Sequence, residues 1–180
     1  VDVFVPRGGR SLIERVINDS RVPVFRHLDG ICHTYVQKSS EIKEAAKIVV
    51  NAKMRRPGIC GATETLLIDK EILDTHLPEI IKLLKQKNCD IIGDEAVCKY
   101  DKSIIKATEK DWSTEYLDSI ISIKTIQKGV REAVNHINKY GSGHTDSIIS
   151  SDKISVDFFL DKVCLLYTSD AADECRGVGV

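Results

Sequence analysis

One segment of the sequence carries the clearest signs of covalent chemistry. Residues 51–65, "NAKMRRPGICGATET", hold Cys60 directly after an Arg-Arg-Pro-Gly bend. Loops that join a helix to a strand often present reactive groups, and Arg55 and Arg56 favour a thiolate if they fold back toward the sulfur. Gly61 leaves space and backbone N–H groups for a developing oxyanion. The alternative is a cysteine that only packs, because free cysteine is among the most buried residue types.

The other cysteines have wide, irregular spacings and no Cys-x-x-Cys pair, which argues against a zinc ribbon and against a disulfide framework. Scattered thiols are typical of a reducing cytoplasm, which is the location we predict. Cys164 falls in a run typical of a buried strand. Cys32 and His33 are neighbours and could form a Cys–His dyad. Adjacent residues of a strand point to opposite faces, however, so we expect Cys32 to pack as well. The histidines share no ligand spacing, and we predict no metal site.

A second candidate is the turn "PRGG" at residues 6–9. Gly8 and Gly9 allow a close backbone approach, the following helix N-terminus favours an anion, and Arg7 adds positive charge. These features fit a phosphate-binding turn. An ordinary strand-to-helix turn is the simpler alternative, because the segment is not the six-position glycine fingerprint.

Three polar residues later in the chain are further candidates. Glu115, in "DWSTEYLDSIISIK", can accept hydrogen bonds from ribose hydroxyls or belong to a solvated acidic turn. His144 and Asp146 share the loop "GSGHTDS". They either position a substrate or form a polar loop with a capping aspartate.

The elements that must position these residues follow from periodicity. Strands are predicted at 1–5, 22–25, 33–37, 64–69, 90–94, 103–108, 119–126 and 146–150, and helices at 10–19, 41–53, 77–88, 127–141 and 154–163. Ser40 is predicted to cap the second helix and Gly141 to end the fourth in a left-handed conformation. Strands that alternate with helices of this length indicate an α/β fold with a largely parallel sheet.

Composition bounds the class of protein. The 180 residues are 42% apolar and 29% charged, with a formal net charge of -1, which is ordinary for a globular domain. Both signs of charge are scattered, and no apolar run approaches the roughly 18 residues of a membrane span. We therefore expect neither a nucleic-acid partner nor a membrane partner.

Taken in order, five segments resemble the γ-glutamyl phosphate reductase (glutamate-5-semialdehyde dehydrogenase) family of the aldehyde dehydrogenase superfamily. They are "VDVFVPRGG", "VPVFRHLDGICHTYV", "IVVNAKMRRPGICGATETLL", "DWSTEYLDSIISIK" and "YGSGHTDSII". The run of Asn-Ala-Lys, Arg-Pro, Cys and Glu-Thr in the third segment is the most specific part. The resemblance covers residues 1 to about 165.

The resemblance implies that Cys60 is the catalytic cysteine of an NADP-dependent oxidoreductase. The implied reaction is the reduction of L-glutamyl 5-phosphate by NADPH to L-glutamate 5-semialdehyde and phosphate, through a thioester on the cysteine, in proline biosynthesis. Another acyl-phosphate or acyl-CoA reductase of the superfamily is an alternative. A non-catalytic scaffold, in which the cysteine only packs, is another.

The same resemblance assigns the other candidates. Glu115 matches the glutamate that contacts the nicotinamide ribose, and Arg7, Gly8 and Gly9 match a turn of the cofactor domain. Arg56, His144 and Asp146 match positions on the substrate side.

Two departures qualify the match. Gly61 replaces the usual asparagine of the family. The stretch "HLDGICH" lacks the glutamate that activates water in aldehyde-oxidising relatives, which suits a reductase, although Asp29 remains an alternative base.

The implied organisation is an aldehyde dehydrogenase-type catalytic domain at residues 31–166, preceded by a remnant of the NADP-binding domain at 1–30. Residues 167–180 resemble nothing in the family, and we expect them to be disordered or artefactual. A chain with so little of the cofactor domain is expected to be inactive by itself. A homo-oligomer remains an open alternative for the full-length enzyme.

Overall fold

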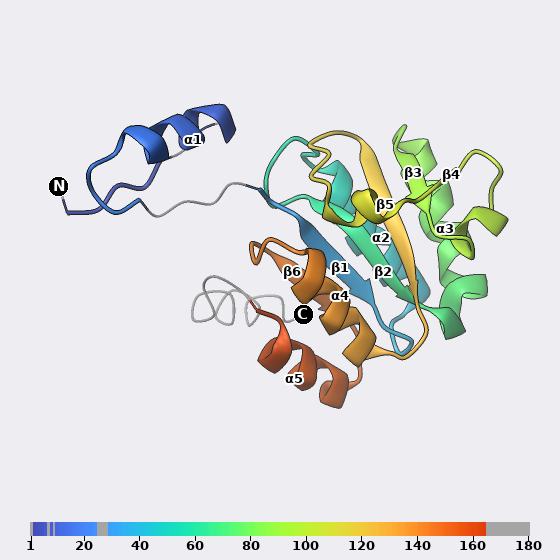
Figure 1. Cartoon of the computed structure of the whole chain (residues 1–180). Helices are drawn as coiled ribbons and strands as arrows, with labels where there is room; N and C mark the ends of the chain where they lie inside the picture. The colour runs from blue at the N-terminus through green and yellow to red at the C-terminus, as the bar shows by residue number, and fades with distance from the viewer. Residues whose placement is uncertain (1, 7, 9, 25–28, 165–180) are drawn as a thin grey trace.

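The computed structural model describes residues 2–6, 8, 10–24 and 29–164 (Figure 1). A six-stranded sheet lies at its centre, with strand order β4-β3-β5-β2-β1-β6 and every pair parallel. The strands are β1 (Cys32–Val36), β2 (Thr63–Asp69), β3 (Asp90–Gly93), β4 (Ile105–Lys106), β5 (Ile120–Ile126) and β6 (Asp146–Ile149). The predicted α/β class with a largely parallel sheet is confirmed.

Helices cover both faces of the sheet (Figure 1). α2 (Ile42–Met54) and α3 (Leu73–Gln86) pack on one face, and α4 (Val130–Tyr140) and α5 (Lys153–Lys162) pack on the other. Short 3₁₀ turns complete the connections at η1 (Lys70–Ile72), η2 (Val97–Lys99) and η3 (Glu109–Ser113).

The central strand β2 shows why this arrangement is stable. All seven of its residues are buried, because a parallel strand between two helical layers has no solvent face. Leu66 and Ile68 join the core under α2 and α3, whereas Leu67 joins the core under α4 and α5. Successive side chains of a strand alternate between faces, so this one strand contributes to both cores.

The N-terminal segment differs from its prediction as a buried strand. Residues 2–6 make one bridge, between Phe4 and Val24, and the side chains of Val3, Phe4 and Val5 are exposed. Helix α1 (Arg10–Asp19) follows, and Figure 1 shows this segment set apart from the sheet. An apolar run becomes a buried strand only where other strands and helices cover it, and the main sheet does not extend to this segment.

Several local predictions are corrected by the structure. Glu41, rather than Ser40, caps α2, and its carboxylate accepts the N–H groups of Lys43 and Glu44. Gly141 ends α4 with φ -69°, which is not left-handed. Cys164 is exposed rather than buried in a strand. The predicted strand at 103–108 contracts to β4. The prediction for the tail at 167–180 is not tested, because these residues lie outside the described ones.

Among the helices that the structure describes, none has the length and apolar character needed to cross a membrane.

Candidate functional site

The candidate residues gather at one edge of the sheet. Cys60, Glu115 and His144 lie in the loops that lead into β2, β5 and β6, and Gly30 lies just before β1. Parallel strands begin at the same edge of a sheet, so loops that precede them converge there. The site is therefore at the amino ends of the strands, with its residues drawn from distant parts of the sequence.

Cys60 is exposed on the loop between α2 and β2. The helix ends at Met54 with Arg55 as its C-cap, and two turns follow, in which Ile59 N–H donates to the Arg56 carbonyl (3.3 Å) and Ala62 N–H donates to the Ile59 carbonyl (3.0 Å). Proline at position 57 cannot continue the helical ladder, which is why the chain turns here. The alternative that this cysteine is simply a packed core residue is wrong.

Gly30 fixes the backbone of this loop. A β-carbon at residue 30 would lie 2.0 Å from the Cys60 carbonyl oxygen and 2.6 Å from its Cα. Only glycine permits so close an approach between the two backbones. The N–H of Gly30 donates to Glu115 Oε1 at 2.8 Å, so the Glu115 carboxylate is tied to the residue that touches the cysteine.

Cys32, the first residue of β1, also holds this loop in place. Its thiol donates to the Cys60 carbonyl at 3.1 Å. Burial, followed by the nearby charge of Asp146, raises the pKa of the Cys32 thiol to about 12, because desolvation disfavours the thiolate. Cys32 is therefore a hydrogen-bonding thiol, consistent with the packing role expected from the sequence.

His144 lies next to this arrangement. Its Nδ1 is 3.8 Å from Cys32 Sγ and 2.7 Å from Thr145 Oγ1. A β-carbon on Gly61 would be 3.9 Å from His144 Cε1, which places the imidazole ring beside the residue that follows the cysteine. His144 and Cys60 are thus brought together at the site.

Asp146 has a different environment from His144. Its Oδ1 accepts the backbone N–H of His33 (2.9 Å) and lies 3.0 Å from His33 Nδ1, and both side chains are fully buried. Parallel pairing of β1 with β6 places the two residues opposite each other. In this structure Asp146 anchors His33 and is remote from solvent. The role of His33 could not be predicted from the sequence, because the pairing order of the strands is not visible there.

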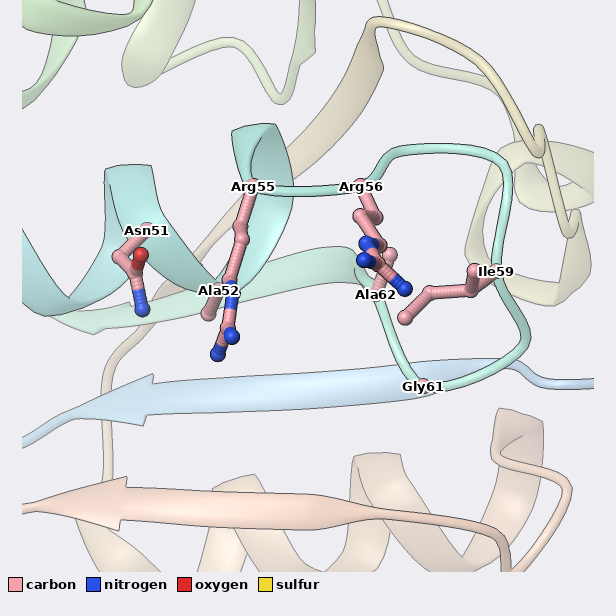
Figure 2. Close-up of a pocket in the computed structure, with 7 residues that line it drawn as sticks. All are labelled: Asn51, Ala52, Arg55, Arg56, Ile59, Gly61 and Ala62. Atoms are coloured by element: carbon pink, nitrogen blue, oxygen red, sulfur yellow. The ribbon is translucent and has the colours of Figure 1, made fainter.

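A cleft of about 330 Å³ is lined by the two chain neighbours of Cys60, Ile59 and Gly61, and carries positive charge from two arginines. Arg55 and Arg56 are both exposed and line it together with Asn51. Figure 2 shows these three side chains on the same side of the helix end and the loop. The full lining is Asn51, Ala52, Arg55, Arg56, Ile59, Gly61 and Ala62. Guanidinium groups bind phosphate and carboxylate groups in a planar, two-pronged geometry, so this cleft suits an anion.

A buried ion pair lies beneath the loop and was not anticipated. Lys53 Nζ is 2.6 Å from Glu64 Oε2, and neither side chain is exposed. A sequence signal existed, because Lys53 continues the i, i+4 spacing of the buried residues Ala45 and Val49 along α2. A lysine on an apolar stripe is otherwise expected to extend its charge to water.

The cofactor candidates are only partly described. Arg7 and Gly9 lie outside the described residues, and Gly8 has φ +155° in the N-terminal segment. Glu115 is linked to the cysteine through Gly30. Over the described ranges, no group of three or more His, Cys, Asp or Glu side chains is arranged to hold a metal ion.

The sequence and the fold were compared with those of known proteins. No protein-family model matches the chain. The γ-glutamyl phosphate reductase of Parvibaculum lavamentivorans is 50% identical over 163 residues, which is 91% of this chain and 38% of the relative. The crystal structure of the γ-glutamyl phosphate reductase from Thermotoga maritima superposes with a TM-score of 0.87 at 38% identity, covering 92% of this chain and 40% of that chain.

A betaine aldehyde dehydrogenase from Staphylococcus aureus superposes with a TM-score of 0.69 at 11% identity, which shows a shared fold alone. The chain therefore has the aldehyde dehydrogenase-type α/β fold. Within that class it is a homologue of the γ-glutamyl phosphate reductases, which confirms the resemblance drawn from its motifs. It spans roughly two fifths of the length of the curated relatives that it matches.

Proposed function

We propose that this chain supplies the nucleophile and part of the substrate site of a γ-glutamyl phosphate reductase. Such an enzyme reduces L-glutamyl 5-phosphate with NADPH to L-glutamate 5-semialdehyde and phosphate, in proline biosynthesis. The observation that supports this most is Cys60, which is exposed on a loop held by Gly30 and Cys32. The close similarity to reductases of that name supports the choice of substrate.

The chemistry begins with attack by the Cys60 thiolate on the acyl carbon of the substrate. A C–S bond forms, the C–O bond to the phosphate breaks, and inorganic phosphate leaves with the bonding electrons. The product of this step is a thioester, so one difficult reduction is divided into two steps. Gly61 leaves room beside the sulfur for the tetrahedral intermediate, since it has no side chain.

The charged cleft is the proposed place for the anionic groups of the substrate. Arg56 and Arg55 line it within five residues of Cys60 in the chain. Two guanidinium groups stabilise the negative charge that grows on the departing phosphate. His144, whose ring lies beside Gly61, is the residue we propose to contact the substrate, whereas Asp146 acts through the start of β1, which it holds at His33.

Glu115 is the described residue that fits a nicotinamide cofactor. One carboxylate oxygen accepts Gly30 N–H at 2.8 Å, and Gly30 touches Cys60, so a ribose held by the second oxygen would lie beside the nucleophile. A nicotinamide cofactor bound there would supply the hydride that reduces the thioester. The residues of this chain orient the acyl group and the ribose.

An acylation experiment tests the proposal. The purified chain is incubated with L-glutamyl 5-phosphate generated in place by an ATP-dependent glutamate kinase, then quenched in acid, freed of small molecules and digested for peptide mass spectrometry. Hydroxylamine, added to a duplicate only after the acyl phosphate has been removed, cleaves thioesters and should release the group. We expect a glutamyl group on the peptide that contains Cys60, and none in Cys60→Ser. Acyl-CoA substrates run in parallel separate this function from an acyl-CoA reductase.

The expected extent of reaction follows from the length that the chain shares with its relatives. Because it matches 38% of the Parvibaculum reductase, we expect the chain alone not to sustain NADPH oxidation. Steady turnover by the chain alone would contradict this part of the proposal. An unacylated Cys60, under conditions that acylate the Parvibaculum reductase, would contradict the assignment of the nucleophile.

A further inference from the structure

The buried ion pair lies at the two ends of the nucleophile loop. Lys53 is in the last turn of α2, Glu64 is the second residue of β2, and the segment between them carries Cys60. Lys53 Nζ and Glu64 Oε2 are 2.6 Å apart with both side chains fully buried. The pair therefore closes the base of the loop.

Stability alone does not explain a charged pair in this position. Removing two charges from water is expensive, and a well-packed apolar pair of similar volume is often as stable or more stable. Burial raises the pKa of Glu64, whereas the hydrogen bond and charge of Lys53 oppose that rise. The pair thus offers a defined geometry rather than a large gain in stability.

Glu64 also reaches a second part of the site. Its Oε1 accepts the N–H of Leu117 at 3.3 Å. Leu117 has φ 53°, a left-handed conformation that a leucine rarely adopts and that needs support from its surroundings. The carbonyl oxygen of Leu117 faces the loop, because a β-carbon on Gly58 would lie 3.6 Å from it.

These contacts connect both ends of the loop to the segment at residues 115–117, which also contacts the support of the nucleophile. Two residues before Leu117, Glu115 accepts the N–H of Gly30, and Gly30 lies against the Cys60 backbone. One carboxylate, that of Glu64, therefore links the base of the loop to the segment that holds its tip.

We propose that Lys53 and Glu64 are positioning residues for Cys60, acting through the loop ends and the Leu117 segment. The inference rests on the proposed function of Cys60 as the nucleophile. The pair does not touch the substrate. It fixes where the sulfur lies relative to Glu115 and the cleft.

The test separates positioning from stability. The full 180-residue chain is prepared as Lys53→Met/Glu64→Leu, which removes both charges, and as Glu64→Gln, a smaller change that keeps the side-chain shape. The matched control is Tyr35→Phe, which removes a buried hydrogen bond of 2.7 Å to Asp69, at the end of β1 and β2 that is remote from the loop. Each protein is measured for its unfolding temperature and for the rate of Cys60 alkylation by iodoacetamide as a function of pH.

We expect the double variant and Glu64→Gln to slow alkylation of Cys60 roughly tenfold and to change its pH profile, because the reactivity of a thiol depends on the charges around it and on its accessibility, and both change if the loop moves. The control should change the unfolding temperature but not the rate. Wild-type rates and pH profiles in both Glu64 variants would overturn the inference. A wild-type Cys60 that reacts no faster than the exposed Cys164 would instead count against the proposed function, so the two failures are distinguishable.

Discussion

Gly30 and Cys60 are in direct backbone contact, with room for no side chain between them. A β-carbon on Gly30 would be 2.0 Å from the Cys60 carbonyl oxygen, a distance that real atoms do not reach. The glycine before β1 thereby determines where the loop before β2 can lie. A residue far from the cysteine in sequence is part of its immediate support.

Replacing Gly30 with alanine should therefore disturb the site. The added methyl group meets backbone atoms, which cannot rotate away as a flexible side chain does. We expect a loss of about 1–3 kcal/mol in the free energy of unfolding, the usual result of overpacking. Urea unfolding followed by circular dichroism measures this loss.

Gly58, which lies in the loop that carries Cys60, provides the control for that change. A β-carbon on Gly58 would be 3.6 Å from the Leu117 carbonyl oxygen, an ordinary contact. Gly58→Ala should therefore keep nearly the wild-type free energy of unfolding. Equal stability of the two variants would mean that the contact between Gly30 and Cys60 is not tight in solution.

The cysteines should differ sharply in accessibility. Cys60 and Cys164 are exposed, whereas burial raises the pKa of Cys32 to about 12 and that of Cys89 to about 11. At pH 8 a thiol with a pKa of about 12 is only about one part in ten thousand thiolate, the reactive form. Iodoacetamide should modify the two exposed thiols in the native chain and the two buried ones only after unfolding, as followed by peptide mass spectrometry. Early modification of Cys32 would show that the loop opens readily.

The sequence was most informative where one element carries its own pattern. The apolar spacing from Ala45 to Val49 predicted α2 to within a residue of its end, and the Arg-Arg-Pro-Gly bend predicted the turn that exposes Cys60. Each of these signals is local. The predicted residues also preceded predicted strands, which is why they meet at one edge.

Contacts between elements were the part that the sequence could not supply. Asp146 was expected beside the substrate, but its partner is His33, because β6 pairs with β1 rather than with its neighbour in sequence. Lys53 had the spacing of a core residue and the chemistry of a surface residue. Its pairing with Glu64 could be identified only from the structure, in which α2 packs against β2.

Asp146 should contribute to stability more than its position in a polar loop suggests. Its Oδ1 is within hydrogen-bond distance of two nitrogen atoms of His33, and both side chains are fully buried. Asp146→Ala leaves these groups unpaired, and we expect a loss of about 1–3 kcal/mol in the free energy of unfolding. The exposed Asp157 provides a control, since Asp157→Ala should change stability little. Similar results for the two variants would argue that Asp146 instead serves the substrate.

His136 gives the chain a specific dependence on pH. It is a buried residue of α4, and its ring lies against those of His33, Trp112 and Tyr140. Burial, followed by the positive charges that His33 and Lys124 can carry, lowers the pKa of His136 from 6.5 to about 3, although Glu109 opposes the shift. In that interval the unfolded chain binds a proton that the folded chain excludes.

The sign of the effect follows from this difference in proton binding. Stability is fully present above pH 6.5 and is lost as the pH falls toward 3, because protons then favour the unfolded state. Between pH 7 and pH 5 the loss attributable to His136 should be about 2 kcal/mol. Buried carboxyl groups with raised pKa values, such as Glu64 and Asp69, act in the opposite direction, so the contribution of the histidine must be isolated by substitution.

His136→Phe keeps an aromatic ring in the cluster and removes the titration. Urea unfolding at a series of pH values should show a shallower decline for this variant than for the wild type, and parallel curves would place the pH dependence elsewhere.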